Sequence, residues 1–76
     1  MDTNPTPTAT ELARVRRLCA TGAARAIRET AGLSLAEVGA AAHVERTTIW
    51  KWEKARRRPH GDAAIRYLRV LEEMAR

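Results

Sequence analysis

Hydrophobic residues along this chain recur every three or four positions, which places them on one face of an α-helix. Two such segments cover residues 9–20 and 23–31 and are separated by Thr21-Gly22. Because glycine weakens a helix interior by about 1 kcal/mol and threonine is a good N-cap, we expect two helices here rather than one long helix. The residues expected to face inward are Leu12, Val15, Leu18, Cys19, Ala23, Ala26, Ile27 and Thr30.

Two capping boxes, at residues 8–11 (TATE) and 34–37 (SLAE), predict where helices begin. In such a box the first side chain accepts a hydrogen bond from a first-turn N–H, and the glutamate reaches back to the cap. The second box opens a short helix with Leu35, Val38 and Ala42 inward. The small residues at positions 39–41 let another helix approach closely.

Helical spacing stops at residues 43–44 and resumes with Ile49 and Trp52, three positions apart. We expect this helix over about residues 45–56, because Pro59 prevents its continuation. No segment of the chain alternates with a period of two. The predicted fold class is therefore all-α, a compact bundle of about five helices.

The last predicted helix carries more apolar residues than one helix face needs. Asp62 or His60 is expected to cap it, and its inward face would hold Ile65, Leu68, Leu71 and Ala75. A neighbouring stripe of Tyr67, Val70 and Met74 widens the apolar arc well beyond the ~100° of an ordinary surface helix. Either the helix at residues 9–20 covers this surplus or a second subunit does.

Length and composition bound the domain organisation. The 76 residues, 45% of them hydrophobic, are enough for one small domain. We expect a disordered tail over residues 1–8 and a single domain over residues 9–76. The sequence has no secretory signal and no apolar run near 18 residues, so we expect a cytoplasmic protein without a membrane partner.

The sequence offers no candidate catalytic, cofactor or metal site. The single cysteine excludes an internal disulfide and lies far along the chain from both histidines. No nucleophile–base pair, phosphate-binding loop or pair of carboxylates stands at a useful spacing. We therefore expect neither an enzyme nor a bound cofactor or metal.

Positive charge is concentrated in one segment. The chain has a net charge of +5, and residues 46–58 hold six basic side chains against Glu53 alone. A stripe of this kind is either a solvated helix face or a surface for an anionic partner, with nucleic acid the first candidate.

A short helix, a tight turn and a basic second helix indicate a helix-turn-helix over about residues 35–56. With Ile49 and Trp52 inward, the opposite face carries the candidate base-contacting residues, which are Arg46, Thr47, Trp50 and Lys51. For Trp50 the alternative is packing on a neighbouring subunit or on Arg and Lys stems. The candidate phosphate contacts are Ser34, Lys54, Arg56, Arg57 and Arg58.

Residues 22–71 resemble the Cro/lambda-repressor type of helix-turn-helix, the Xre family. The segments that carry the resemblance are residues 26–34 (AIRETAGLS), 35–44 (LAEVGAAAHV), 48–53 (TIWKWE) and 57–59 (RRP). The chain is also similar to small Ala- and Arg-rich regulators of actinobacteria and their phages. The resemblance implies a lambda-repressor-like domain and a sequence-specific transcription regulator, and many members of the family bind as dimers.

The resemblance also implies roles for single residues. Arg28 and Glu53 match a structural pair that joins the first helix of the family's core to its recognition helix. Arg46, Thr47 and Lys51 match positions that face bases, and residues 56–57 match a basic loop near phosphates. Three positions depart from the family pattern. They are Gly39 in place of alanine, His43 in place of the turn glycine and Leu35 in place of a phosphate-binding glutamine.

The predicted function is sequence-specific binding of double-stranded DNA as a transcriptional regulator or repressor, with the helix at about residues 45–56 in the major groove and a homodimer on the DNA. One alternative is an antitoxin that regulates its own gene and docks a toxin protein on the surplus apolar stripe. Another is an excisionase-like architectural protein, which would need the strands of a wing after Pro59.

Overall fold

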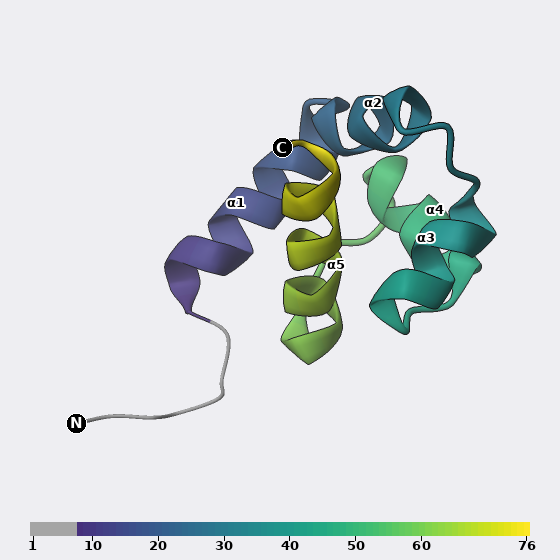
Figure 1. Cartoon of the computed structure of the whole chain (residues 1–76). Helices are drawn as coiled ribbons and strands as arrows, with labels where there is room; N and C mark the ends of the chain where they lie inside the picture. Colours follow the sequence, from purple (N-terminus) through teal and green to yellow (C-terminus); the bar gives the residue numbers. More distant parts are fainter. Residues whose placement is uncertain (1–7) are drawn as a thin grey trace.

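Five helices follow one another along the part of the chain that the computed structural model describes, residues 8–76 (Figure 1). They are α1 (Ala9–Ala20), α2 (Ala23–Thr30), α3 (Leu35–Ala42), α4 (Arg46–Glu53) and α5 (Gly61–Met74). The predicted all-α class is confirmed. Of the expected tail, residues 1–7 lie outside the described residues, whereas Thr8 is the N-cap of α1.

Both predicted capping boxes are formed. The Thr8 hydroxyl accepts from the Glu11 N–H at 3.1 Å, and the Ser34 hydroxyl accepts from the Glu37 N–H at 3.0 Å. Glu37 in turn accepts from the Ser34 N–H at 2.8 Å, and these hydrogen bonds lower the pKa of its carboxyl. The expected break between α1 and α2 is also present, because Gly22 takes a left-handed φ of 86° that a continuous helix would not contain.

α4 ends earlier than the sequence predicts. It stops at Glu53 instead of continuing to about residue 56, and Ala55 takes a left-handed φ of 58°. The N–H of Arg56 then donates to the carbonyl of Lys51 at 2.9 Å, which closes the helix end. Pro59 lies too far along to decide the helix end.

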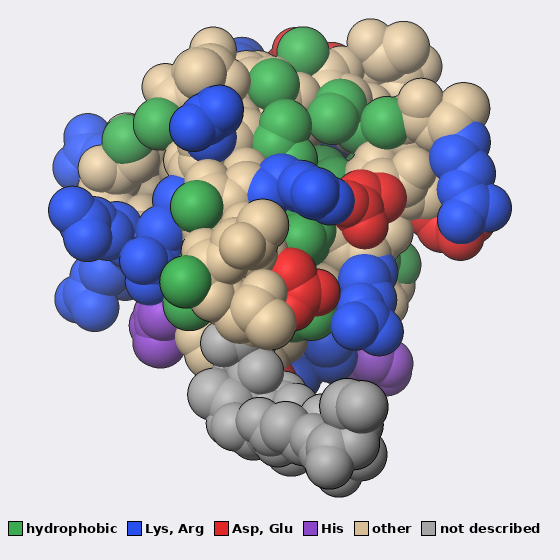
Figure 2. All heavy atoms as spheres, turned by 90° about the vertical axis from the view of Figure 1, so that its left-hand side faces the viewer, with side chains coloured by type: hydrophobic (Ala, Val, Ile, Leu, Met, Phe, Trp, Pro, Cys, Tyr) green, Lys and Arg blue, Asp and Glu red, His purple; other side chains and the backbone are tan. Residues whose placement is uncertain are grey.

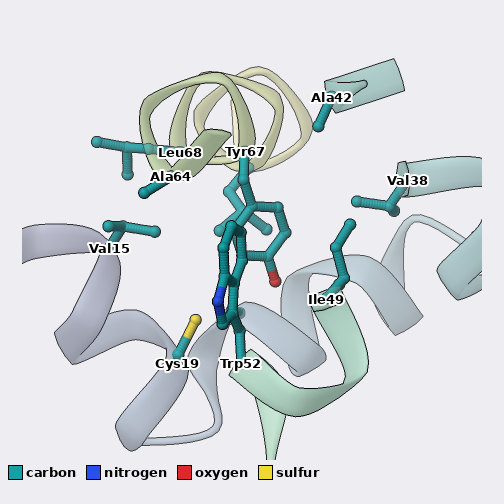
Figure 3. Close-up of a cluster of buried hydrophobic side chains, with 11 residues drawn as sticks. Val15, Cys19, Val38, Ala42, Ile49, Trp52, Ala64, Tyr67 and Leu68 are labelled. Carbon is teal, nitrogen blue, oxygen red and sulfur yellow. The ribbon is translucent and has the colours of Figure 1, made fainter. Parts of the chain in front are cut away.

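α5 stands between α1 on one side and the α3–α4 pair on the other, with α2 across one end (Figure 1). Figure 3 shows the core that this arrangement encloses, with the Trp52 and Tyr67 rings at its centre. Their centroids are 5.4 Å apart. Cys19 of α1 is buried beside them. Its burial, and to a smaller extent the nearby Glu53 carboxylate, raises the pKa of its thiol to about 11.

The inward faces differ from the prediction in two helices. In α2 the buried residue is Ala24, while Ala26 and Thr30 are exposed. In α5 the buried set is Ala64, Tyr67, Leu68 and Leu71, while Ala75 lies beyond the helix and is exposed. α2 is therefore turned so that Ala24 faces the core, whereas in α5 two of the predicted inward residues, Leu68 and Leu71, are buried as expected.

The surplus apolar stripe is partly covered within one subunit. Tyr67 is fully buried, and its hydroxyl has no hydrogen-bond partner among the described residues. Val70 and Met74 pack against the core while half-buried. α1 lies along α5 and contributes Val15 and Cys19 to the same core, so much of the covering comes from the chain itself.

The start of α5 also differs from expectation. His60 occupies the N-cap position but makes no side-chain capping bond, and Asp62 lies within the first turn. α5 fills residues 61–74, the segment in which a wing would need its strands.

Gly39 of α3 lies against the backbone of residues 44 and 46, where the turn leads into α4. A β-carbon added at this position would be 2.5 Å from the Val44 carbonyl oxygen, which is a backbone atom that cannot swing aside. The N–H of Val44 also donates a hydrogen bond to the Gly39 carbonyl at 2.9 Å, which holds the two backbone segments together. The turn can therefore pack this closely against α3 only because residue 39 has no side chain.

We expect Gly39→Ala to destabilise the protein by roughly 1–3 kcal/mol, because overpacking against a fixed carbonyl outweighs the gain in helix propensity. Urea unfolding followed by far-UV circular dichroism measures the change. Ala41→Gly, at an exposed position of the same helix, is the matched control and reports helix propensity alone. A more stable Gly39→Ala variant would show that propensity governs this position.

Candidate nucleic-acid interface

The inner face of α4 fixes which of its side chains point outward. Ile49 and Trp52 are 0% and 1% exposed, packed against the core. Arg46 and Thr47, in the first turn of α4, are exposed on the other side of the helix. Lys51 is half-buried, so it reaches the surface from a less open position than the sequence predicts.

A bidentate ion pair ties α4 to α2. Arg28 Nε donates to Glu53 Oε2 at 2.7 Å and Nη2 donates to Oε1 at 3.0 Å, while Nη1 donates to the Leu33 carbonyl at 3.0 Å. The Glu53 side chain is only 2% exposed, and its hydrogen bonds raise the pKa of the Arg28 guanidinium. The pair that the family resemblance implies is therefore present. Removing either partner of such a pair costs roughly 3–5 kcal/mol.

A second arginine holds the turn between α3 and α4. Arg66 of α5 donates from Nε to the Ala42 carbonyl at 2.9 Å and from Nη2 to the His43 carbonyl at 3.1 Å. His43 itself takes the left-handed φ of 56° that its position in the turn requires. Sequence reasoning missed Arg66, since nothing local distinguishes it from a solvated arginine of α5.

A third arginine fixes the basic loop that follows α4. Arg16 Nε donates to the Pro59 carbonyl at 2.9 Å from a part-buried position. Its neighbours on α1 differ, because Arg14 pairs with Glu72 at the surface and Arg17 is exposed. The loop anchored at Pro59 presents Arg57 and Arg58 to solvent.

Trp50 lies on the outward side of α4 and is the one large hydrophobic residue classed as exposed in residues 8–76, at 37%. The Arg56 guanidinium lies over its ring, with the carbon Cζ 5.3 Å from the ring centroid. This cation–π contact joins the outward face of α4 to the basic loop that follows it. It matches the alternative in which Trp50 packs on an arginine stem, and it leaves part of the indole open to a ligand.

The outward faces of α3 and α4 border an open hollow of about 650 Å³, here called the α3–α4 hollow. Its lining residues are Ser34, Leu35, Ala36, Arg46, Thr47 and Trp50. The hollow thus brings together three of the four predicted base contacts and one predicted phosphate contact. Lys51 instead borders a separate, smaller cavity beside Arg57 and His60.

The N-terminus of α3 is partly occupied by the protein itself. The Glu37 carboxylate accepts a hydrogen bond from the Ser34 N–H. A phosphate at this end of α3 would therefore receive its hydrogen bonds from the Ser34 hydroxyl and from neighbouring backbone N–H groups. Phosphate binding by Ser34 stays a prediction.

The exposed basic residues of α4 and its loop have no ion-pair partner among residues 8–76. The basic side chains of the five ion pairs are Arg14, Arg25, Arg28, Arg69 and Arg76. Figure 2, which views the side of α1, shows a dense group of Lys and Arg at its left-hand edge, apart from the acidic side chains. Unpaired cations attract an anionic partner over a distance of several ångströms.

Within residues 8–76 no three His, Cys, Asp or Glu side chains are grouped so that they would hold a metal ion. None of the five helices is long and apolar enough to cross a membrane.

Comparison with known proteins agrees with this geometry. A family model described as a helix-turn-helix domain matches residues 9–74, which include all five helices. No curated protein and no solved structure matches the sequence. The match covers most of the chain, and the α3–turn–α4 unit supplies the two helices that define such a domain. The chain therefore belongs to the helix-turn-helix domain family, a DNA-binding fold.

Proposed function

We propose that this protein is a sequence-specific transcriptional repressor that reads the major groove of double-stranded DNA with α4. One observation carries the proposal: the first turn of α4 exposes Arg46 and Thr47 while the opposite face of the helix is fully buried. An α-helix fits the major groove of B-DNA, and the N-terminal residues of a recognition helix reach base edges there. We propose that the protein acts in the cytoplasm, without a cofactor and not as an enzyme.

The first turn of α4 carries the base-reading part of the proposal. Arg46 can donate two hydrogen bonds to O6 and N7 of a guanine, a contact worth about 1–3 kcal/mol of discrimination. Thr47 offers a hydroxyl and a methyl group on the same exposed surface. Lys51, one turn further and half-buried, is placed to reach a guanine or a phosphate from the groove edge.

The loop after α4 carries the proposed phosphate contacts. Lys54 and Arg56–Arg58 are exposed there. The Arg16 bond to the Pro59 carbonyl supports this role, because a fixed loop presents its charges without first losing chain entropy. Such contacts position the protein on the duplex without reading its sequence.

We further propose a homodimer on the DNA. A recognition helix of eight residues reaches only a few base pairs, so two copies on neighbouring half-sites would give the specificity of a regulator. The half-buried residues Val70 and Met74, four positions apart on α5, are the apolar surface offered for the contact. A toxin partner would use the same surface, and copurification of a second protein would favour that alternative.

Selection of binding sites from random duplex DNA, repeated at several salt concentrations, tests the proposed function. For about four to six phosphates per subunit, log K should fall with log salt with a slope of about −4 to −5 per subunit. A dimer predicts two half-sites whose centres are one helical turn, roughly 34 Å, apart. A salt-insensitive affinity, or no enrichment of any sequence, would contradict the proposal.

Arg46→Ala and Arg57→Ala separate reading from positioning. Arg46→Ala should lose about 1–3 kcal/mol of discrimination at one base pair of each half-site while the fold is unchanged. Arg57→Ala, the matched control, should weaken binding equally on all sequences and reduce the salt slope by about 1. Titrations of each variant with the selected duplex and its single-base variants measure both effects. An equal loss on every sequence for Arg46→Ala would make Arg46 a phosphate contact.

A further inference from the structure

The α3–α4 hollow has an apolar floor in the middle of a basic surface. Leu35, Ala36 and Trp50 supply the carbon-rich part of its lining, and Ser34, Arg46 and Thr47 supply the polar part. A surface made only to hold phosphates would be lined by donors throughout. This floor suits a ligand group that is apolar.

Trp50 is the aromatic residue of the hollow and contacts the loop that follows α4. The Arg56 guanidinium lies over its ring, 5.3 Å from the centroid, an attraction that favours this position of the indole. Trp50 keeps 37% of its surface exposed, and it lines the hollow together with Leu35. Leu35 is itself half-buried against the core.

Arg46 and Thr47 line the same hollow and belong to the first turn of α4. A group that enters the hollow from a DNA duplex therefore comes from the major groove, next to the base that Arg46 contacts. The major-groove edges of the four bases carry one apolar group, the C5-methyl of thymine. The same methyl occurs at the same ring position in 5-methylcytosine.

We propose that the α3–α4 hollow binds the C5-methyl group of a pyrimidine, so that Leu35, Ala36 and Trp50 determine specificity at that position. The inference rests on the proposed function, because it needs α4 in the major groove. Seating the methyl removes it and the exposed floor from water, and no other base edge offers the floor an apolar partner.

The test removes or adds single methyl groups on the selected duplex. Each thymine is replaced in turn by deoxyuridine, which lacks only the methyl, and each cytosine in turn by 5-methylcytosine. We expect one position per half-site at which binding weakens about fourfold without the methyl or tightens about fourfold with it. Weaker binding of a duplex with deoxyuridine identifies the group in the hollow as the methyl of thymine. Tighter binding with 5-methylcytosine, without any effect of deoxyuridine, identifies it as the methyl of a methylated cytosine.

Protein variants link that position to the hollow. Trp50→Ala should abolish the difference between the methylated and unmethylated duplexes, and Ala36→Gln, which fills the floor from an exposed position, should do the same. Lys54→Ala is the matched control and should lower both affinities by the same factor. Circular dichroism establishes that each variant is folded.

Two results would overturn the inference and leave the proposed function intact. One is sequence-specific, salt-dependent binding that responds to no methyl change at any pyrimidine. The other is a methyl effect that both Trp50→Ala and Ala36→Gln retain. Failure to bind any duplex would instead contradict the proposed function itself.

Discussion

Burial of Ile49 and Trp52 is the constraint on which the interface depends. α4 has only eight residues, and a helix this short is not stable in water by itself. Its position comes from these two side chains, which are almost completely removed from solvent between α1, α3 and α5. Because they fix the rotation of the helix, Arg46 and Thr47 must lie on its exposed side.

Arginine side chains hold the surroundings of α4 in place. Arg28 joins its C-terminal turn to α2, Arg66 binds the carbonyls at the end of α3, and Arg16 binds the loop at Pro59. A guanidinium offers several donors in a fixed plane, which suits it to exposed carbonyls at helix ends and in loops. The same residue type therefore serves the scaffold at three positions and the proposed DNA contacts at others.

Local signals in the sequence predicted most of the fold. The capping boxes at Thr8 and Ser34 and the break at Gly22 depend on neighbouring residues only, and all three are present. The left-handed Ala55 ends α4 early, and no residue preference at that position announces it. The rotation of α2, which buries Ala24, depends on packing against distant helices, which periodicity in eight residues does not determine.

The candidate site was predictable to a similar extent. Spacing from Ile49 and Trp52 placed Arg46, Thr47 and Trp50 on one surface, as the α3–α4 hollow has them. The roles of Arg16 and Arg66 were not predictable, because their carbonyl partners lie 43 and 23–24 residues away in the sequence. The stack of Arg56 on Trp50 likewise depends on the loop turning back at Ala55.

Nuclear magnetic resonance titration of the isotope-labelled protein with its selected duplex maps the DNA-contacting surface residue by residue. We expect the largest amide shift changes in the first turn of α4, at residues 34–36 and in the loop at 54–58, with the Trp50 indole N–H among them. The inner-face amides of α1 and α5 should change little. Large changes on the outer faces of α1 and α5, with the first turn of α4 unaffected, would contradict the account.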